Sequence, residues 1–277
     1  MKSQSKYKFP VLSILLILIP FILSGQSNTP VEGYVPEVGQ QGKDVVWVPT
    51  PQELVDTMLA IAKVTPSDFV IDLGSGDGRT VISAAKKGAR ALGIEYNPDM
   101  VSLSKKNAAK AGVSEKTEFL EADLYDTDLS KATVITMFLL PEINLKLRPR
   151  LLELKPGTRI VSNTFTMGEW EADIHVTTED NWNSWNTALL WIVPAKVEGT
   201  WKLGRDELIL TQEYQMVQGK LTQGEKTITI SGGKLNGNEI TFRAGDYLYT
   251  GIINGNRMSG KVSDSVLGNT GNWTAVR

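Results

Sequence analysis

The sequence has 277 residues, with 29 Lys and Arg against 31 Asp and Glu, so the formal net charge is −2. This balance lacks the basic excess typical of nucleic-acid-binding proteins, and we expect no nucleic-acid partner. The absence of cysteine excludes disulfides and thiolate metal sites, and the single histidine, His175, leaves little material for a zinc site or a catalytic triad. We expect no metal.

The N-terminus has the pattern of a targeting segment. Three lysines, at positions 2, 6 and 8, precede an apolar run from Val11 to Leu23, and small polar residues follow. This order predicts a signal peptide or membrane anchor over residues 1–27. The run is shorter than the roughly 20 apolar residues of a typical span, and both cleaved and uncleaved forms remain open. We expect an exported protein, periplasmic or extracytoplasmic, or one associated with the membrane through this segment.

The next residues predict an arm followed by an α/β domain. Residues 28–47 are rich in Pro and Gly and indicate a linker or arm. Thr50-Pro51-Gln52-Glu53 reads as a capping box, with Thr50 as the N-cap of a helix. Strand and helix patterns then alternate across residues 48–194, which predicts a parallel sheet covered on both faces. The expected strands are 68–73, 89–95, 117–121, 133–139 and 159–165, and the expected helices are 79–87, 97–111 and 142–154. Asn97-Pro98 is expected to cap the helix over 97–111.

The pattern of the sequence changes after Pro194. Glycines punctuate short alternating segments, and Asn236-Gly237 and Asn254-Gly255 are strong hairpin signals. Residues 195–277 therefore predict a separate antiparallel meander or small barrel. Such a domain could bind substrate, hold a partner or close over the main domain, and a stabilising or partner-docking role is the favoured reading.

The candidate site begins where the first strand of the sheet ends. Asp72 precedes a glycine-rich loop with Gly74, Ser75, Gly76 and Gly78, and the loop leads into a helix. Glycines there allow a sharp turn and the close approach of a ligand to the main chain. A glycine loop alone is weak support for a binding site, because ordinary turns share its composition.

Two further acids follow the next strands in register. Glu95 ends the second strand, where a carboxylate can accept hydrogen bonds from both hydroxyls of a ribose. Asp123 follows the third strand, where it can accept from an adenine amino group. Together with Asp72, these acids lie at the carboxyl ends of consecutive strands, where open α/β sheets bind ligands.

These residues resemble the class I S-adenosylmethionine-dependent methyltransferases. The resemblance covers roughly Val48 to Pro194 and implies a Rossmann-like seven-stranded sheet, here followed by a small all-β C-terminal domain. It also implies S-adenosyl-L-methionine as cofactor, a sixth strand near 174–177 and an antiparallel seventh near 187–193. In that family the residue after the ribose acid, here Tyr96, often packs on the adenine.

A narrower resemblance points to the acceptor. The segments 47–51, 72–79, 138–141 and 161–165 are similar to lysine methyltransferases that modify mitochondrial membrane proteins. This implies a methyltransferase acting on lysine amines of a protein. Phe138-Leu139-Leu140-Pro141 replaces the Asn/Asp-Pro-Pro-aromatic motif common in enzymes that methylate DNA bases or glutamine amides, which counts against those acceptors.

The catalytic residues are not determined by the sequence. Glu142 is a candidate for orienting an amine, and a first-turn helix acid is an equal reading. Trp170, Trp182 and Trp185 could line an acceptor channel through cation–π contacts, or could be packing aromatics.

Two other functions remain open. One is an exported, non-catalytic binding protein built on a methyltransferase fold, since the cofactor is made in the cytoplasm. The other is a nicotinamide-dependent oxidoreductase, but the Gly-x-Gly-x-Gly spacing and the extra acids Asp72 and Asp123 favour the sulfonium cofactor. The oligomeric state is left open.

Overall fold

The computed structural model describes residues 33–179 and 184–277. The segment predicted as a signal peptide or anchor lies outside the described residues. Within the described part of the chain, no helix is both long and apolar enough to cross a bilayer.

A seven-stranded mixed sheet forms the first part of the described chain. Its order is β3-β2-β1-β4-β5-β7-β6. The first five strands pair in parallel, and β7 runs antiparallel to both β5 and β6, as the class I resemblance implies. The strands are β1 (Phe69–Leu73), β2 (Arg90–Glu95), β3 (Thr117–Glu121), β4 (Val134–Met137), β5 (Arg159–Asn163), β6 (Ile174–Thr177) and β7 (Thr187–Ile192).

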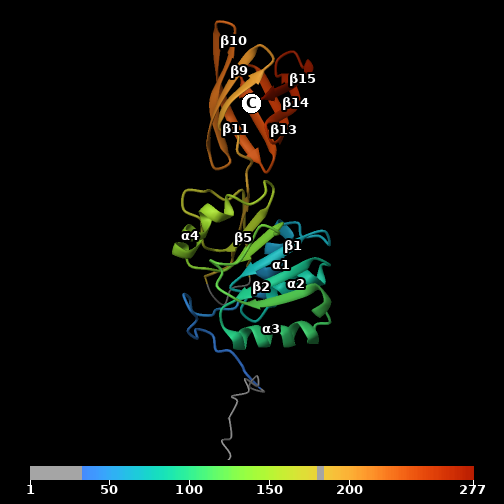
Figure 1. The fold of residues 1–277 in the computed structure, drawn as a ribbon, viewed down its shortest axis with the longest axis vertical. Helices are drawn as coiled ribbons and strands as arrows, with labels where there is room; N and C mark the ends of the chain where they lie inside the picture. Colours follow the sequence, from blue (N-terminus) through green and yellow to red (C-terminus); the bar gives the residue numbers. More distant parts are fainter. Residues whose placement is uncertain (1–32, 180–183) are drawn as a thin grey trace, which may run out of the picture. The chain divides into compact units, whose positions relative to one another are not determined.

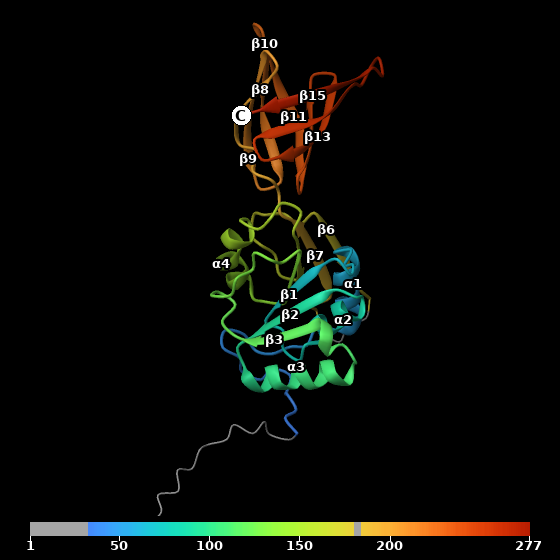
Figure 2. The same cartoon turned by 45° about the vertical axis from the view of Figure 1, so that its right-hand side comes forward.

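Helices cover both faces of this sheet (Figures 1 and 2). Alternate residues of a strand point to opposite faces. Val70 therefore joins a buried cluster with α1, α2 and α3, and Ile71 joins another with α4. The helices are α1 (Gln52–Ile61), α2 (Arg79–Lys86), α3 (Pro98–Lys110) and α4 (Pro141–Leu151), with a short 3₁₀ turn at Ser114–Lys116.

The two predicted helix starts differ in outcome. Asn97 caps α3 by accepting hydrogen bonds from the backbone N–H groups of Asp99 and Met100, as its sequence indicates. The predicted capping box of α1 is wrong, because Pro51 is the N-cap and no side chain caps the helix. Thr50 Oγ1 instead accepts a hydrogen bond from Asn163 Nδ2 at 3.3 Å. The Thr50 hydroxyl therefore takes part in a tertiary contact and not in a helix cap.

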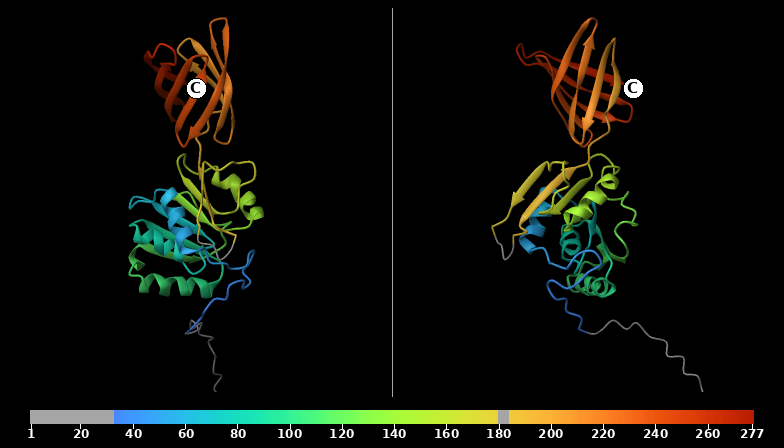
Figure 3. Two further views of the ribbon diagram at one scale, coloured as in Figure 1. Left: turned by 180° about the vertical axis from the view of Figure 1, so that it is seen from behind. Right: turned by 90° about the vertical axis from the view of Figure 1, so that its left-hand side faces the viewer.

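The C-terminal strands close into an eight-stranded antiparallel barrel, which Figure 3 shows from two further sides. The Asn236-Gly237 and Asn254-Gly255 turns connect neighbouring strands, as predicted. Phe242 stacks on Tyr249 with 4.8 Å between ring centroids, and aromatic side chains fill the interior. The strands are β8 (Gly199–Leu203), β9 (Asp206–Glu213), β10 (Met216–Gln223), β11 (Lys226–Asn236), β12 (Glu239–Ala244), β13 (Tyr247–Asn254), β14 (Arg257–Asp264) and β15 (Thr270–Val276). The domain limits 48–194 and 195–277 themselves stay predictions.

The packing of α4 gives a stability prediction. Leu147 is fully buried against the sheet, whereas Leu145 on the same helix is 40% exposed. Leu147→Ala should lower the free energy of unfolding by about 2–5 kcal/mol, because it leaves a cavity in the core. Leu145→Ala should change it by about 0.5 kcal/mol or less. Urea denaturation of the two variants checks this difference, and equal losses would contradict the assignment of the buried face.

Candidate active site

The glycine-rich loop between β1 and α2 makes a sharp backbone turn. Gly74, Gly76 and Gly78 all have positive φ angles, of 75°, 54° and 82°, which other residues rarely adopt. The N–H groups of Gly74 and Ser75 both donate to Ile94 O at 2.9 Å, so the loop is held against the end of β2.

Close packing beneath the loop requires another glycine that sequence reasoning missed. A Cβ at Gly93, in β2, would lie 2.6 Å from Ser75 Oγ and 2.7 Å from Phe119. An isolated glycine inside a strand is the signal that could have revealed this close approach.

Glu95 binds the loop and its own following turn at once. Its Oε2 accepts a hydrogen bond from Gly76 N at 2.9 Å, and its Oε1 accepts from Asn97 N at 3.0 Å. Each carboxylate oxygen can accept a second hydrogen bond. The fixed carboxylate therefore keeps acceptor capacity for ligand hydroxyls.

Asp72 is the buried acid of the site. Its side chain accepts a hydrogen bond from Thr136 Oγ1 at 2.6 Å. Burial, reinforced by the negative charges of Glu95 and Asp77, raises the pKa of Asp72 to about 7. A cationic group beside this carboxyl would favour its ionised form, so the site is suited to a ligand ammonium.

Asp123 and Tyr96 form the opposite side of the site. Asp123 Oδ1 accepts from Tyr125 N at 2.9 Å, and Lys43 Nζ donates to Asp123 Oδ2. The hydrogen bond from Lys43, followed by that from the Tyr125 amide, lowers the pKa of Asp123. The Tyr96 ring is 54% exposed and lies 4.7 Å from the Lys43 ammonium.

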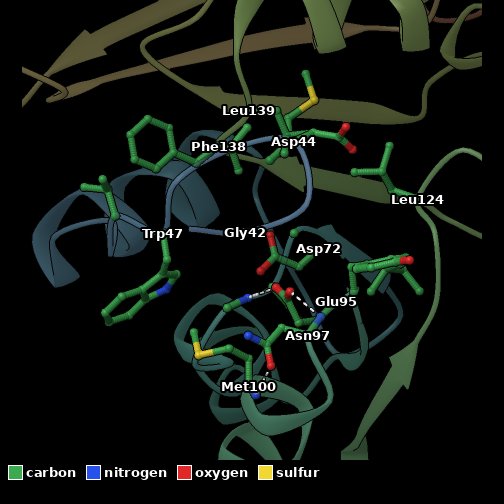
Figure 4. A pocket seen from close by; sticks show the side chains of 18 of the residues that line it. Gly42, Asp44, Trp47, Asp72, Glu95, Asn97, Met100, Leu124, Phe138 and Leu139 are labelled. Atoms are coloured by element: carbon green, nitrogen blue, oxygen red, sulfur yellow. Dashed lines mark hydrogen bonds between the residues drawn. The ribbon is translucent and has the colours of Figure 1, made fainter. Parts of the chain in front are cut away.

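Part of the arm predicted over 28–47 contributes to the site. Gly39 N donates to Trp47 O and Trp47 N donates to Gln40 O, which makes a small hairpin of residues 39–47. Figure 4 shows Gly42 and Trp47 of this hairpin on the rim of the pocket that contains Asp72 and Glu95. The sequence indicates an extended segment here but gives no signal that it covers a site.

These elements enclose one cavity of about 400 Å³. All eight residues predicted to bind cofactor line or flank it, and all but Gly78 are among its lining residues. Those seven are Asp72, Gly74, Ser75, Gly76, Glu95, Tyr96 and Asp123. Gly78 lies at the start of α2, where a Cβ would meet Phe119 and Ser104.

Only one of the residues predicted to contact the acceptor is a lining residue of the cavity in the described part of the chain. Trp185 lines the cavity together with Phe138 and Phe165, whose rings stack with centroids 5.9 Å apart. Trp185 meets Phe138 edge-on at 5.8 Å. Trp170 is buried elsewhere against Trp191 and Tyr214, and Trp182 lies outside the described residues. Glu142 is exposed on the first turn of α4 and is not a lining residue, so its catalytic role stays a prediction.

The chemical groups that line the cavity match the parts of S-adenosylmethionine. The glycine loop leaves the main chain accessible, and Asp72 offers a buried carboxyl for the ammonium of the methionine part. Glu95 would hold the ribose hydroxyls, and Tyr96 with Asp123 would hold the adenine. Together with the strand order, these groups define a class I S-adenosylmethionine-dependent methyltransferase.

Comparisons with known proteins identify the family. The model described as the ANTKMT methyltransferase domain matches residues 72–174. A protein-lysine N-methyltransferase of Saccharolobus islandicus (strain REY15A) is 41% identical over 152 residues, which are 54% of this chain and 94% of that protein. The adenine nucleotide translocase lysine N-methyltransferase of Mus musculus is 32% identical over 162 residues, which are 58% of this chain and 66% of that protein. The chain thus spans slightly less than two thirds of the length of the mouse relative.

A solved structure agrees with the fold. An RNA methyltransferase from Salinibacter ruber, crystallised in complex with S-adenosyl-L-homocysteine, is 48% identical with a TM-score of 0.51. The match covers 54% of this chain and 96% of that chain. The chain belongs to the ANTKMT family of S-adenosylmethionine-dependent methyltransferases.

The raised pKa of Asp72 predicts how cofactor binding depends on pH. The cofactor ammonium favours the carboxylate, so wild-type affinity should rise between about pH 6 and pH 8 as Asp72 loses its proton. Asp72→Asn keeps the shape and an acceptor for Thr136 but cannot ionise. Calorimetric titration should therefore find weaker binding by this variant, with little dependence on pH.

The raised pKa of Asp72 also predicts how the stability of the ligand-free protein depends on pH. The folded-state pKa of about 7 lies above the unfolded value of about 3.9, so the folded protein holds the proton more tightly. Relative to Asp72→Asn, the wild type should lose stability as pH rises from about 4 through 7, by at most about 4 kcal/mol. Parallel pH profiles of the two proteins would contradict a raised pKa.

Proposed function

We propose that this enzyme methylates lysine amines of a protein. The observation that carries the proposal is the 41% identity with the protein-lysine N-methyltransferase of Saccharolobus islandicus. The charge of the cavity is compatible with it. The lining contains five carboxylates and two cations, and both cations are paired with carboxylates, Lys43 with Asp123 and Arg79 with Asp77.

The aromatic side of the cavity suits the same acceptor. Phe138, Phe165 and Trp185 present ring faces and edges that can pack on the aliphatic stem of lysine and stabilise an ammonium through cation–π contact. When bound, S-adenosylmethionine supplies an electrophilic methyl group for attack by a neutral amine. The chain's contribution is to align that amine and exclude water, which accounts for much of the rate in such transfers.

RNA is the competing acceptor, because the Salinibacter ruber relative is described as an RNA methyltransferase. The net charge of −2 and the acidic cavity favour lysine over RNA. The lysine-modifying relatives from Saccharolobus islandicus and Mus musculus support the same choice.

The location of the enzyme is a second part of the proposal. We infer from the lysines before Val11, and from the apolar run to Leu23, that the chain is exported or held at the membrane, with a membrane-associated protein as substrate. An exported enzyme would need a supply of cofactor outside the cytoplasm. Cell fractionation with N-terminal sequencing of the mature protein tests this, and a full-length protein in the soluble cytoplasm would contradict it.

Methyl transfer from labelled S-adenosylmethionine tests the acceptor. Full-length enzyme should label proteins in cell extracts, with mass spectrometry locating the methyl groups on lysine, and should leave RNA unlabelled. Glu95→Ala should abolish labelling because it removes the acceptor for the ribose hydroxyls. Label in RNA would favour the competing acceptor, and cofactor binding without any transfer would favour the non-catalytic binding protein.

The aromatic cluster gives a matched pair of variants. Trp185→Ala should lower kcat/KM for the protein acceptor by about tenfold while leaving cofactor affinity unchanged, because the proposal places the acceptor, and not the cofactor, against this ring. Trp185→Phe should restore most of the loss. Equal weakening of cofactor binding in the alanine variant would contradict the assignment of this end to the acceptor.

A further inference from the structure

Lys43 lies where the cofactor's adenine is expected. Its ammonium donates to Asp123 and lies over the Tyr96 ring, and all three residues line the same cavity. Tyr96 and Asp123 are the two groups that would hold the adenine, so one cation already contacts both members of that subsite.

Lys43 and the adenine would compete for the same space between Tyr96 and Asp123. Asp123 Oδ1 is used by the Tyr125 amide and Oδ2 by Lys43, although each oxygen could accept one more hydrogen bond. An adenine that donates to Asp123 and packs on Tyr96 needs the volume between them. The Lys43 ammonium, 4.7 Å from the ring centroid, takes that volume.

The hairpin of residues 39–47 holds Lys43 in this position. Gly42 N donates to Val45 O, and the paired backbones of Gly39, Gln40 and Trp47 close the hairpin that presents Lys43 to the cavity. Trp47 in turn lies against the glycine loop, where a Cβ on Gly76 would be 2.6 Å from its Nε1. The side chain is therefore delivered to this subsite by a folded element that also contacts the cofactor loop.

We propose that Lys43 is a built-in competitor for the adenine subsite, and that cofactor binding displaces its ammonium from Tyr96 and Asp123. The inference rests on the cofactor site and is independent of the acceptor. It predicts that the arm lowers cofactor affinity and that removing one exposed cation tightens binding.

The test is calorimetric titration of S-adenosylhomocysteine into the full-length protein and its variants. This probe lacks the sulfonium charge, so loss of a lysine does not act through repulsion of that charge. Lys43→Met should lower Kd by about three- to tenfold, the range expected for one exposed ion pair with a cation–π contact. Lys43→Arg, which keeps the cation, should bind like the wild type.

Lys146 supplies the matched control. Its ammonium lies 3.6 Å from the Tyr125 ring centroid and acts on Asp123 only through space, without contacting Tyr96. Lys146→Met should leave Kd within about twofold of wild type. Equal tightening in both variants would show that general charge removal, and not displacement of Lys43, explains the effect.

Ionic strength provides a second measurement. Salt screens the attraction between Lys43 and Asp123, so the ratio of wild-type to Lys43→Met dissociation constants should fall towards one as salt is added. Unchanged or weaker binding by Lys43→Met would overturn the proposal and assign Lys43 a supporting role beside the adenine. Absence of binding by every protein, wild type included, would instead remove the cofactor assignment on which the inference rests.

Discussion

One carbonyl group that accepts two hydrogen bonds, at the carboxyl end of β2, determines how the site is assembled. The carbonyl oxygen of Ile94 accepts hydrogen bonds from both Gly74 N and Ser75 N, which ties the end of β1 to the end of β2. The backbone can reach this arrangement only with left-handed conformations at glycines. Once the loop is fixed there, Gly76 N meets the Glu95 carboxylate, and the acids of neighbouring strands converge on one cavity.

Burial and the convergence of these acids make ionisation of Asp72 unfavourable in the ligand-free protein. Asp72 is buried beside two other carboxylates, and its pKa is raised to about 7. An ionised group in such surroundings destabilises the folded protein unless a cation joins it. Perturbed acids of this kind cluster at functional sites.

Much of the fold and part of the site could be predicted from local patterns. Short apolar strands, the Asn97 cap and the Asn-Gly turns are decided by neighbouring residues, and the structure has them where the sequence indicates. The glycine loop and its acids could be placed because the carboxyl ends of parallel strands meet at one edge.

The remaining features depend on contacts between distant residues. Thr50 lies one residue before the N-cap of α1, and its hydroxyl accepts a hydrogen bond from Asn163, far along the chain. Lys43 reaches Asp123 across 80 positions, and Phe138, Phe165 and Trp185 come from three separate segments. Periodicity and motif spacing do not record contacts between distant residues. The sequence therefore names Trp185 as a candidate but cannot predict its contact with Phe138 or the cover that the arm forms over the cavity.

The C-terminal barrel has a filled interior and closes between its last strand and its first. Rings of Trp201, Phe242, Tyr249 and Trp273 occupy its core, and β15 pairs with β8 to complete the circuit. Outward side chains and loop tips, such as the exposed Val266 and Leu267, do not take part in this packing. These positions can change without repacking the interior, so the outer surface of the barrel can vary while its fold stays constant.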